Sequence, residues 1–219
     1  MRSLAKLAVV GAVAGLLVFP SLSSAAPPKF GLKAGLNVAD IHGADVGTLE
    51  SLFGSSWKAK LGFCGGGFVI FPLSKGMAVQ AEALYTQKGA EMSGTIDIGA
   101  GPEPFKLYWN TDYLEIPVLF RYGFETKGRL KPFLFAGPAL GIKMSAKLKV
   151  EAEGESADQD ISNFRSTDFG LVFGGGVDIG KISIDFRYTM GLTKLLESEG
   201  QTADIKNGVF TLMVGYCFK

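Results

Sequence analysis

Residues 209–218, which read VFTLMVGYCF, alternate without interruption between two faces. One face carries large apolar side chains, namely Phe210, Leu212, Val214, Tyr216 and Phe218. The opposite face is small-sided, with threonine, glycine and cysteine among its members. A period of two residues predicts a β-strand. A strand with one large apolar face and one small-sided face is typical of the closing strand of a membrane barrel, where lipid covers one face and a narrow lumen the other.

The first 25 residues predict export. They combine a basic start at Arg2 and Lys6, an apolar run over 7–19 and small residues before Ala26, which together indicate a secretory signal peptide. We therefore predict a signal peptide over 1–25 and one barrel domain over 26–219. The whole chain has 22 basic and 21 acidic residues, and the signal removes two basic ones, so the mature chain is close to neutral. Such a balance gives no indication of nucleic-acid binding.

Eight segments of the mature chain show the same alternation and combine glycines with aromatic residues; the whole chain has thirty glycines. The predicted strands cover residues 29–37, 58–71, 77–88, 108–122, 131–151, 167–179, 183–190 and 209–218. Outside the signal, no segment approaches the roughly 20 consecutive apolar residues that a transmembrane helix requires. The fifth segment keeps one phase for so long that we expect it to continue beyond a membrane.

The connections between these segments alternate in length. Short ones lie at 72–76, 123–130 and 180–181, and long ones at 38–57, 89–107, 152–166 and 194–206. Short periplasmic turns and long extracellular loops are the layout of outer-membrane barrels. The sequence thus predicts an all-β fold, an eight-stranded antiparallel up-and-down transmembrane β-barrel of the outer-membrane type, with both termini in the periplasm of a Gram-negative bacterium. A soluble lipocalin-like barrel is the alternative, but it would carry its large apolar residues inside.

Several stretches resemble one known family. They read FGLKAGLN at 30–37, EALYTQKG at 82–89, YLEIPVLFRY at 113–122 and FRYTMGLT at 186–193, together with the Ala-Gly-Pro within 132–141. Over nearly the whole mature chain they resemble the PorT-like outer-membrane β-barrel family. The resemblance implies an eight-stranded outer-membrane barrel, common in Bacteroidetes and related bacteria and mostly without an assigned activity. The named member, PorT, is linked to a protein secretion system, and no motif in this chain is specific to that member.

Charged residues on the small-sided faces are expected inside the barrel, where they must be paired because side chains fill an eight-stranded lumen. We predict one salt-bridge network from Lys33, Glu82, Glu115, Arg121, Asp185 and Arg187, with Arg121 and Asp178 nearer the mouth. Arg187 is expected to bridge Glu82 and Glu115, because a planar guanidinium can hold two carboxylates. A second, more basic group lies higher and consists of Lys60, Lys88, Lys143 and Asp168. The lower network could be a polar core that replaces an apolar one, or it could be a plug or a gated proton or ion path.

Other candidate residues carry weaker signals. His42, the single histidine, lies in a long loop with Ser51, Ser55 and Ser56, a combination that a lipid-modifying enzyme could use. Cys64 and Cys217 are predicted to remain thiols facing the lumen. The aromatic residues Trp57, Trp109, Tyr85, Tyr108, Tyr113 and Tyr188 are expected in the outer aromatic girdle. The acidic residues Glu151, Glu153, Glu155, Asp158 and Asp160 either extend a solvated strand or hold calcium, although their spacing is not that of an EF-hand.

Three functions are compatible with the sequence. The first is a structural, adhesive or partner-binding role through the extracellular loops, without an open pore; the second is a PorT-like accessory role in secretion or assembly; the third, a remote one, is lipid modification. We expect no enzymatic activity, cofactor or metal. The expected partners are outer-membrane lipid, the barrel-assembly machinery during insertion and a protein at the loops, with the barrel itself a monomer.

Overall fold

The computed structural model describes residues 26–97, 102–152, 155–161, 164–198 and 201–218. The predicted signal peptide, 1–25, lies outside the described residues. The elements are β1 (Lys29–His42), α2 (Val46–Phe53), β2 (Trp57–Ser74), β3 (Met77–Asp97), β4 (Pro102–Gly123), β5 (Leu130–Ala152), β6 (Glu155–Asp160), β7 (Thr167–Ile179), β8 (Ile182–Gly191), β9 (Leu196–Ser198), β10 (Gln201–Ala203) and β11 (Lys206–Cys217). In this part of the chain, no helix has the length and apolar character needed to cross a membrane.

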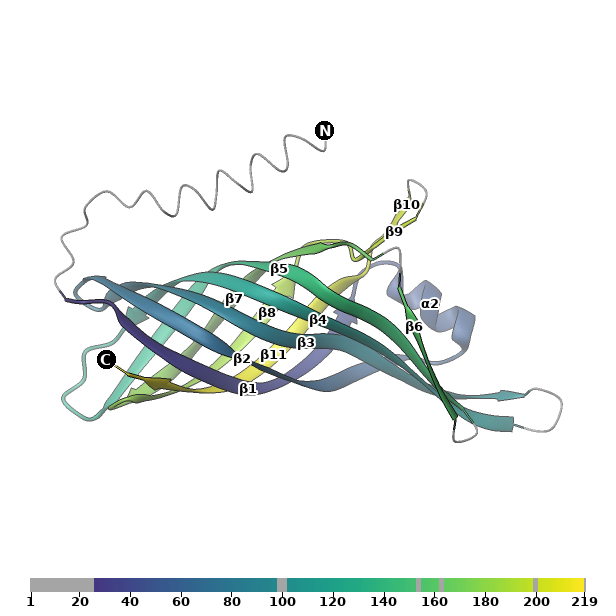
Figure 1. Ribbon diagram of the computed structural model, residues 1–219, viewed down its shortest axis with the longest axis horizontal. Helices are drawn as coiled ribbons and strands as arrows, with labels where there is room; N and C mark the ends of the chain where they lie inside the picture. Colours follow the sequence, from purple (N-terminus) through teal and green to yellow (C-terminus); the bar gives the residue numbers. More distant parts are fainter. Residues whose placement is uncertain (1–25, 98–101, 153–154, 162–163, 199–200, 219) are drawn as a thin grey trace.

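The main sheet is antiparallel and closes into a ring. Its order is β4-β3-β2-β1-β11-β8-β7-β5-β6, and a further pairing of β4 with β5 closes the circle. Eight of these nine strands form the ring, and β6 pairs with β5 alongside it. Figure 1 shows the tilted ring, with the short turns and both ends of the described chain at one end. We call this the turn end, and the opposite one the loop end.

The outer surface of the ring is apolar. In β11 and at Phe218 directly after it, the five large residues that the alternation assigned to lipid are each 44 to 54 % exposed, whereas Val209, Thr211 and Met213 on the opposite phase are buried. The same pattern occurs on β1, where Phe30, Leu32 and Leu36 are exposed, and on every other strand of the ring. A soluble protein rarely exposes such a continuous apolar surface. The large side chains therefore face out and the lumen is polar, which is the opposite of a lipocalin-like barrel.

Register shifts interrupt this alternation within β2 and β5. Between β4 and β5, Asp112 pairs with Ser145 and Tyr113 pairs with Lys143, so Met144 is the extra residue. Beyond it Ala146 points inward and is buried, although an uninterrupted phase predicts that it faces lipid. A second irregularity lies in β2 between Ala59 and Cys64. Each bulge puts two residues opposite one, so side chains beyond it change faces.

Three strands extend far past the ring at the loop end. β3, β4 and β5 have 21, 22 and 23 residues, compared with 10 in β8. A tilted strand needs only about 9–11 residues to cross a bilayer. The long loop predicted at 89–107 is therefore mostly strand, because β3 and β4 pair as far as Asp97 and Pro102. We call β3, β4 and β5 beyond the ring, together with β6, the sheet extension; it projects at the lower right of Figure 1, while α2 and the β9–β10 hairpin lie at the ring mouth.

Candidate functional site

A four-residue ion network occupies the lumen nearer the turn end. Lys33 Nζ lies 2.9 Å from Glu82 Oε1 and 3.0 Å from Asp185 Oδ2. The Arg187 guanidinium contacts Glu82 Oε2 at 2.7 Å and Asp185 Oδ1 at 2.8 Å. All four side chains are almost fully buried. Two cations thus face two anions, and each charge contacts both of opposite sign.

This lower network continues toward the turn end through uncharged and charged partners. Gln80 Nε2 donates to Glu82, and Gln80 Oε1 accepts from Arg121 Nη1 at 2.9 Å. Arg121 also pairs with Asp178 and stacks over the Phe133 ring, 3.6 Å from its centroid. The structure thus links Arg121 to the network indirectly and pairs it with Asp178 near the mouth. Gln80 lies on the same inward phase of β3 as Glu82, but the predicted network contains charged residues alone and so does not include it.

A separate network lies nearer the loop end. Lys88 Nζ lies 2.6 Å from Glu115 Oε2 and 3.6 Å from Asp168 Oδ2. Asn207 Nδ2 donates to Asp168 Oδ2 at 2.9 Å, and Lys88 lies over the Tyr113 ring at 5.0 Å. All of these side chains come from different ring strands except Glu115 and Tyr113, which share β4. This upper network cross-links strands on opposite sides of the ring.

The predicted bridge from Arg187 to Glu115 is wrong. In the strand register, Arg187 of β8 lies opposite Gly174 of β7, and Gly174 lies opposite Phe135 of β5. Phe135 in turn lies opposite Arg121 of β4, so Arg187 and Arg121 stand at the same level of the sheet. Glu115 is six residues from Arg121 along β4, so the strand register moves its carboxylate toward the loop end, within reach of Lys88. Arg187 instead contacts Asp185, two residues away on its own strand. The stagger of strands in a barrel sets these relative heights.

Two predicted members of the upper group do not join it. Lys143 Nζ donates to the Phe164 carbonyl at 2.9 Å and lies over the Phe164 ring. Lys60 is half-buried within the irregular part of β2, and among the described residues Asp168 pairs with Lys88 and not with Lys60. The upper network is therefore less basic than predicted, with one lysine between two carboxylates.

Uncharged polar side chains fill the space between the two networks. Asn37 Nδ2 donates to Thr86 Oγ1 and to the Gln87 carbonyl, each at 2.8 Å, and Asn37 Oδ1 accepts from Thr211 at 2.9 Å. The remaining void here measures about 10 Å³. That volume is at the lower limit for one water molecule. The predicted networks contain charged residues alone and therefore omit Asn37, Thr86 and Thr211, although the sequence places all three on inward phases.

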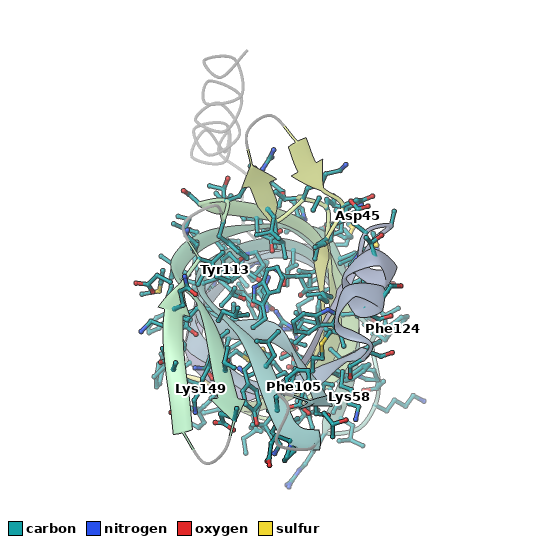
Figure 2. All side chains as sticks on the ribbon, turned by 90° about the vertical axis from the view of Figure 1, so that its right-hand side faces the viewer. Asp45, Lys58, Phe105, Tyr113, Phe124 and Lys149 are labelled. Atoms are coloured by element: carbon teal, nitrogen blue, oxygen red, sulfur yellow. The ribbon has the colours of Figure 1, made fainter. Side chains whose placement is uncertain are left out.

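Aromatic and aliphatic side chains cover the loop end of the lumen. Trp109 packs edge-on against Trp57 and Phe164, with ring centroids 6.1 and 5.8 Å apart, and Tyr113 lies fully buried in the same cluster. Figure 2 looks into the loop end and shows Tyr113 inside the ring and Lys149 on the sheet extension. The prediction of an outer girdle is thus wrong for Trp109 and Tyr113, since both lie on inward positions of β4.

The remaining candidates stay apart from one another. Ser51 donates to the Gly47 carbonyl and Ser55 donates to the Ser93 carbonyl. His42 lies at the end of β1, opposite Lys206 in the backbone register with β11.

Both cysteines are thiols; Cys64 is buried and Cys217 is half-buried. Of the acidic residues, Glu153 lies outside the described residues. Within the described ranges, no group of three or more such side chains is arranged to hold a metal ion.

On the sheet extension, Lys149 Nζ lies 2.6 Å from Glu151 Oε1. This hydrogen bond holds the pKa of Glu151 below its ordinary value and raises the pKa of Lys149. Both groups are exposed to water, so the pair is screened and adds little stability.

A closed antiparallel ring with an apolar exterior, a buried ionic interior and long strands at one end agrees with a sequence match over residues 26–197 to the family described as "Outer membrane protein beta-barrel domain". The chain belongs to this family. Membership indicates a location in the outer membrane of a Gram-negative bacterium, and the more specific PorT-like assignment is not part of that match. None of the curated proteins matches the chain.

Several solved structures are similar in fold. Neisserial surface protein A (NspA) has a TM-score of 0.43 and 17% identity, with 87% of this chain and 99% of that chain covered. The attachment invasion locus protein Ail of Yersinia pestis, in complex with the heparin analogue sucrose octasulfate, has a TM-score of 0.39 and 13% identity, with 88% and 100% covered. The outer membrane protein OprG of Pseudomonas aeruginosa has a TM-score of 0.39 and 12% identity, with 87% and 95% covered. At this distance the likeness carries no functional argument.

Proposed function

We propose that this protein is a transmembrane outer-membrane barrel without an open pore, and that it acts through its sheet extension by binding an extended segment of a partner protein. The turn end and both termini face the periplasm in this proposal, and the sheet extension lies outside the cell. The lumen supports the first part, since ion pairs and packed polar side chains occupy it between the mouths. An eight-stranded ring is also the size at which side chains fill the interior.

The observation that carries the binding role is the position of β6. Its six residues pair with β5, from Lys147 opposite Asp160 to Ala152 opposite Glu155, and β6 ends the sheet order. The Ile161 amide donates to the Ala146 carbonyl, which fixes the hydrogen-bonding phase of this pair of strands. In an antiparallel pair the direction of the amides alternates. The amides of Ser156, Asp158 and Asp160 therefore point away from β5.

An edge strand with outward amides is a template for strand addition. Acidic side chains at Asp158 and Asp160 discourage pairing with a second copy of the same edge, because like charges would lie close together. They favour instead a partner segment with basic residues. The outer face of the sheet extension is charged and solvated, with Lys106, Tyr108 and Lys149 side by side on β4 and β5, so the edge rather than the face offers the binding surface.

Site-specific photocrosslinking in the source cells tests this role. A photoreactive residue at Asp160 is expected to give one discrete crosslinked band. Asp158→Pro, which removes an outward amide without breaking a bond to β5, should abolish the band, whereas Asp158→Asn should retain it. A photoreactive residue at the exposed Lys127, in a turn at the other end, serves as the control position. A band that survives Asp158→Pro, or that also arises from Lys127, would exclude binding at the β6 edge.

A further inference from the structure

A cavity of about 580 Å³ opens at the turn end of the ring. Residues from all eight ring strands line it, and its apolar walls include Phe68, Ile70 and Phe133. Its volume is within the range of about 300–1,000 Å³ found for small-molecule sites. The lower ion network separates this turn-end cavity from the rest of the lumen, because Gln80 connects Arg121 in the cavity wall to Glu82.

The charges around the turn-end cavity are predominantly positive. Five basic side chains line it against two acidic ones: Lys29, Lys75, Arg121, Lys131 and Lys181 against Glu125 and Asp178. The four lysines are exposed and come from β1, the β2–β3 turn, β5 and the β7–β8 turn, so they are distributed around the mouth. The mature chain as a whole is nearly neutral. This concentration of positive charge is thus a local property of the cavity.

Arg121 gives the cavity a defined polar wall. It is 8 % exposed, and its guanidinium is held over the Phe133 ring while Gln80 and Asp178 fix its hydrogen-bonding edge. Asp178 already neutralises this guanidinium, so the four lysines carry the positive charge that the cavity offers to a solute. A cleft that combines low-dielectric walls with charges of one sign also concentrates oppositely charged solutes.

We propose that the turn-end cavity binds a small organic anion, a molecule that carries carboxylate or phosphate groups on an apolar body. The lysines at the mouth attract the anionic groups, and the aromatic walls at Phe68 and Phe133 contact the body. In the proposed orientation the ligand enters from the periplasm. The cavity lies at the end of the barrel opposite the sheet extension, so this proposal stands or falls independently of strand addition at β6.

The test uses the mature chain in nanodiscs of zwitterionic lipid, which leave both ends accessible. The probe is the trisulfonated aromatic dye pyranine, which stays out of lipid, and fluorescence anisotropy measures its dissociation constant. The variant carries Lys75→Gln, Lys131→Gln and Lys181→Gln. A matched control carries Lys58→Gln, Lys147→Gln and Lys194→Gln at the loop end, with the same change in net charge.

The wild type is expected to bind pyranine. One unit-charge contact in water corresponds to about a fivefold change in the dissociation constant, so the loss of three lysines should make the turn-end variant bind about 100-fold more weakly. The control should change less than about twofold, because its lysines lie beyond the screening distance. Citrate or glycerol phosphate should displace the dye, and the more effective of the two identifies the head group. Failure of both, or an equal effect of the two triple variants, would overturn the proposal.

A second measurement needs no equilibrium binding. The Cys217 thiol lines the cavity, so in a Cys64→Ala background its modification reports the local potential. After normalisation to a thiol in solution, an anionic methanethiosulfonate should react faster than a cationic one, and the turn-end variant should lose this preference. A preference for the cationic reagent in the wild type would contradict an anion site even if the triple variants proved unstable.

Discussion

Replacing Arg187 by methionine tests the lower network at its centre. The guanidinium makes contacts of 2.7 and 3.2 Å to Glu82 and of 2.8 and 2.9 Å to Asp185. Without it, two buried carboxylates share the single ammonium of Lys33, which already contacts both. One negative charge therefore stays uncompensated in the lumen. Breaking a buried ion pair by removing one partner typically costs about 3–5 kcal/mol, and we expect Arg187→Met to fall in that range.

Equilibrium urea unfolding of the barrel in lipid vesicles, followed by tryptophan fluorescence, measures this loss. Arg187→Lys keeps the charge but not the two-pronged geometry, so it should cost less than Arg187→Met. The double variant Glu82→Gln with Arg187→Met removes one carboxylate together with the guanidinium and should recover part of the stability. A loss below about 1 kcal/mol in Arg187→Met would refute the reasoning, because it would mean that water or structural rearrangement already neutralises the carboxylates.

Three further outcomes are expected. Lys88→Met should destabilise the barrel by about 3–5 kcal/mol in the same urea assay, since Glu115 and Asp168 lose their shared cation. Trp109→Ala should cost about 3–5 kcal/mol by leaving a cavity in the cluster at the loop end. The pKa of Glu151 lies below its unfolded value, so the contribution of its pair with Lys149 is present above that value, about 4.3, and is lost as pH falls through the folded one. After correction for the intrinsic exchange rate, which itself slows on acidification, the amide protection of β5 and β6 should therefore decrease slightly as pH falls in the wild type, and less so in Lys149→Gln.

Periodicity predicted the ring well because lipid and a polar lumen impose opposite demands on successive residues. The eight segments with alternating sides correspond to the eight ring strands, and β11 shows the assigned outward face in full. The family assignment from quoted motifs such as 113–122 was correct at the level of the outer-membrane β-barrel family. Its finer PorT-like form remains a prediction.

Errors arose where one residue changes the phase or where register decides a contact. Met144 is an extra residue in β5, and no local signal distinguishes it from its neighbours. The partner of Arg187 depends on the stagger across three strand pairs, which a linear sequence does not encode locally. The segment at 89–107 was predicted to be a long loop. In the structure, β3 and β4 instead support each other in water as a hairpin.

The aromatic residues show a related limit. Trp109 and Tyr113 follow the usual composition of an outer girdle, yet they occupy inward positions of β4 above the upper network. Aromatic composition near a strand end therefore did not reveal which face a ring occupies. The strand phase of Thr111, Tyr113 and Glu115 would have placed all three inside, and it was the better guide.

The central claim, a closed barrel whose apolar outer face lies in the outer membrane, has a direct test. The mature chain is folded from urea into detergent micelles and compared on a gel before and after boiling, alongside fractionation of the source cells. We predict faster migration of the unboiled sample and recovery of the protein in the outer-membrane fraction. An unchanged mobility, with the protein soluble in the periplasm, would contradict the account, because the exposed side chains of β1 and β11 would then need a cover other than lipid.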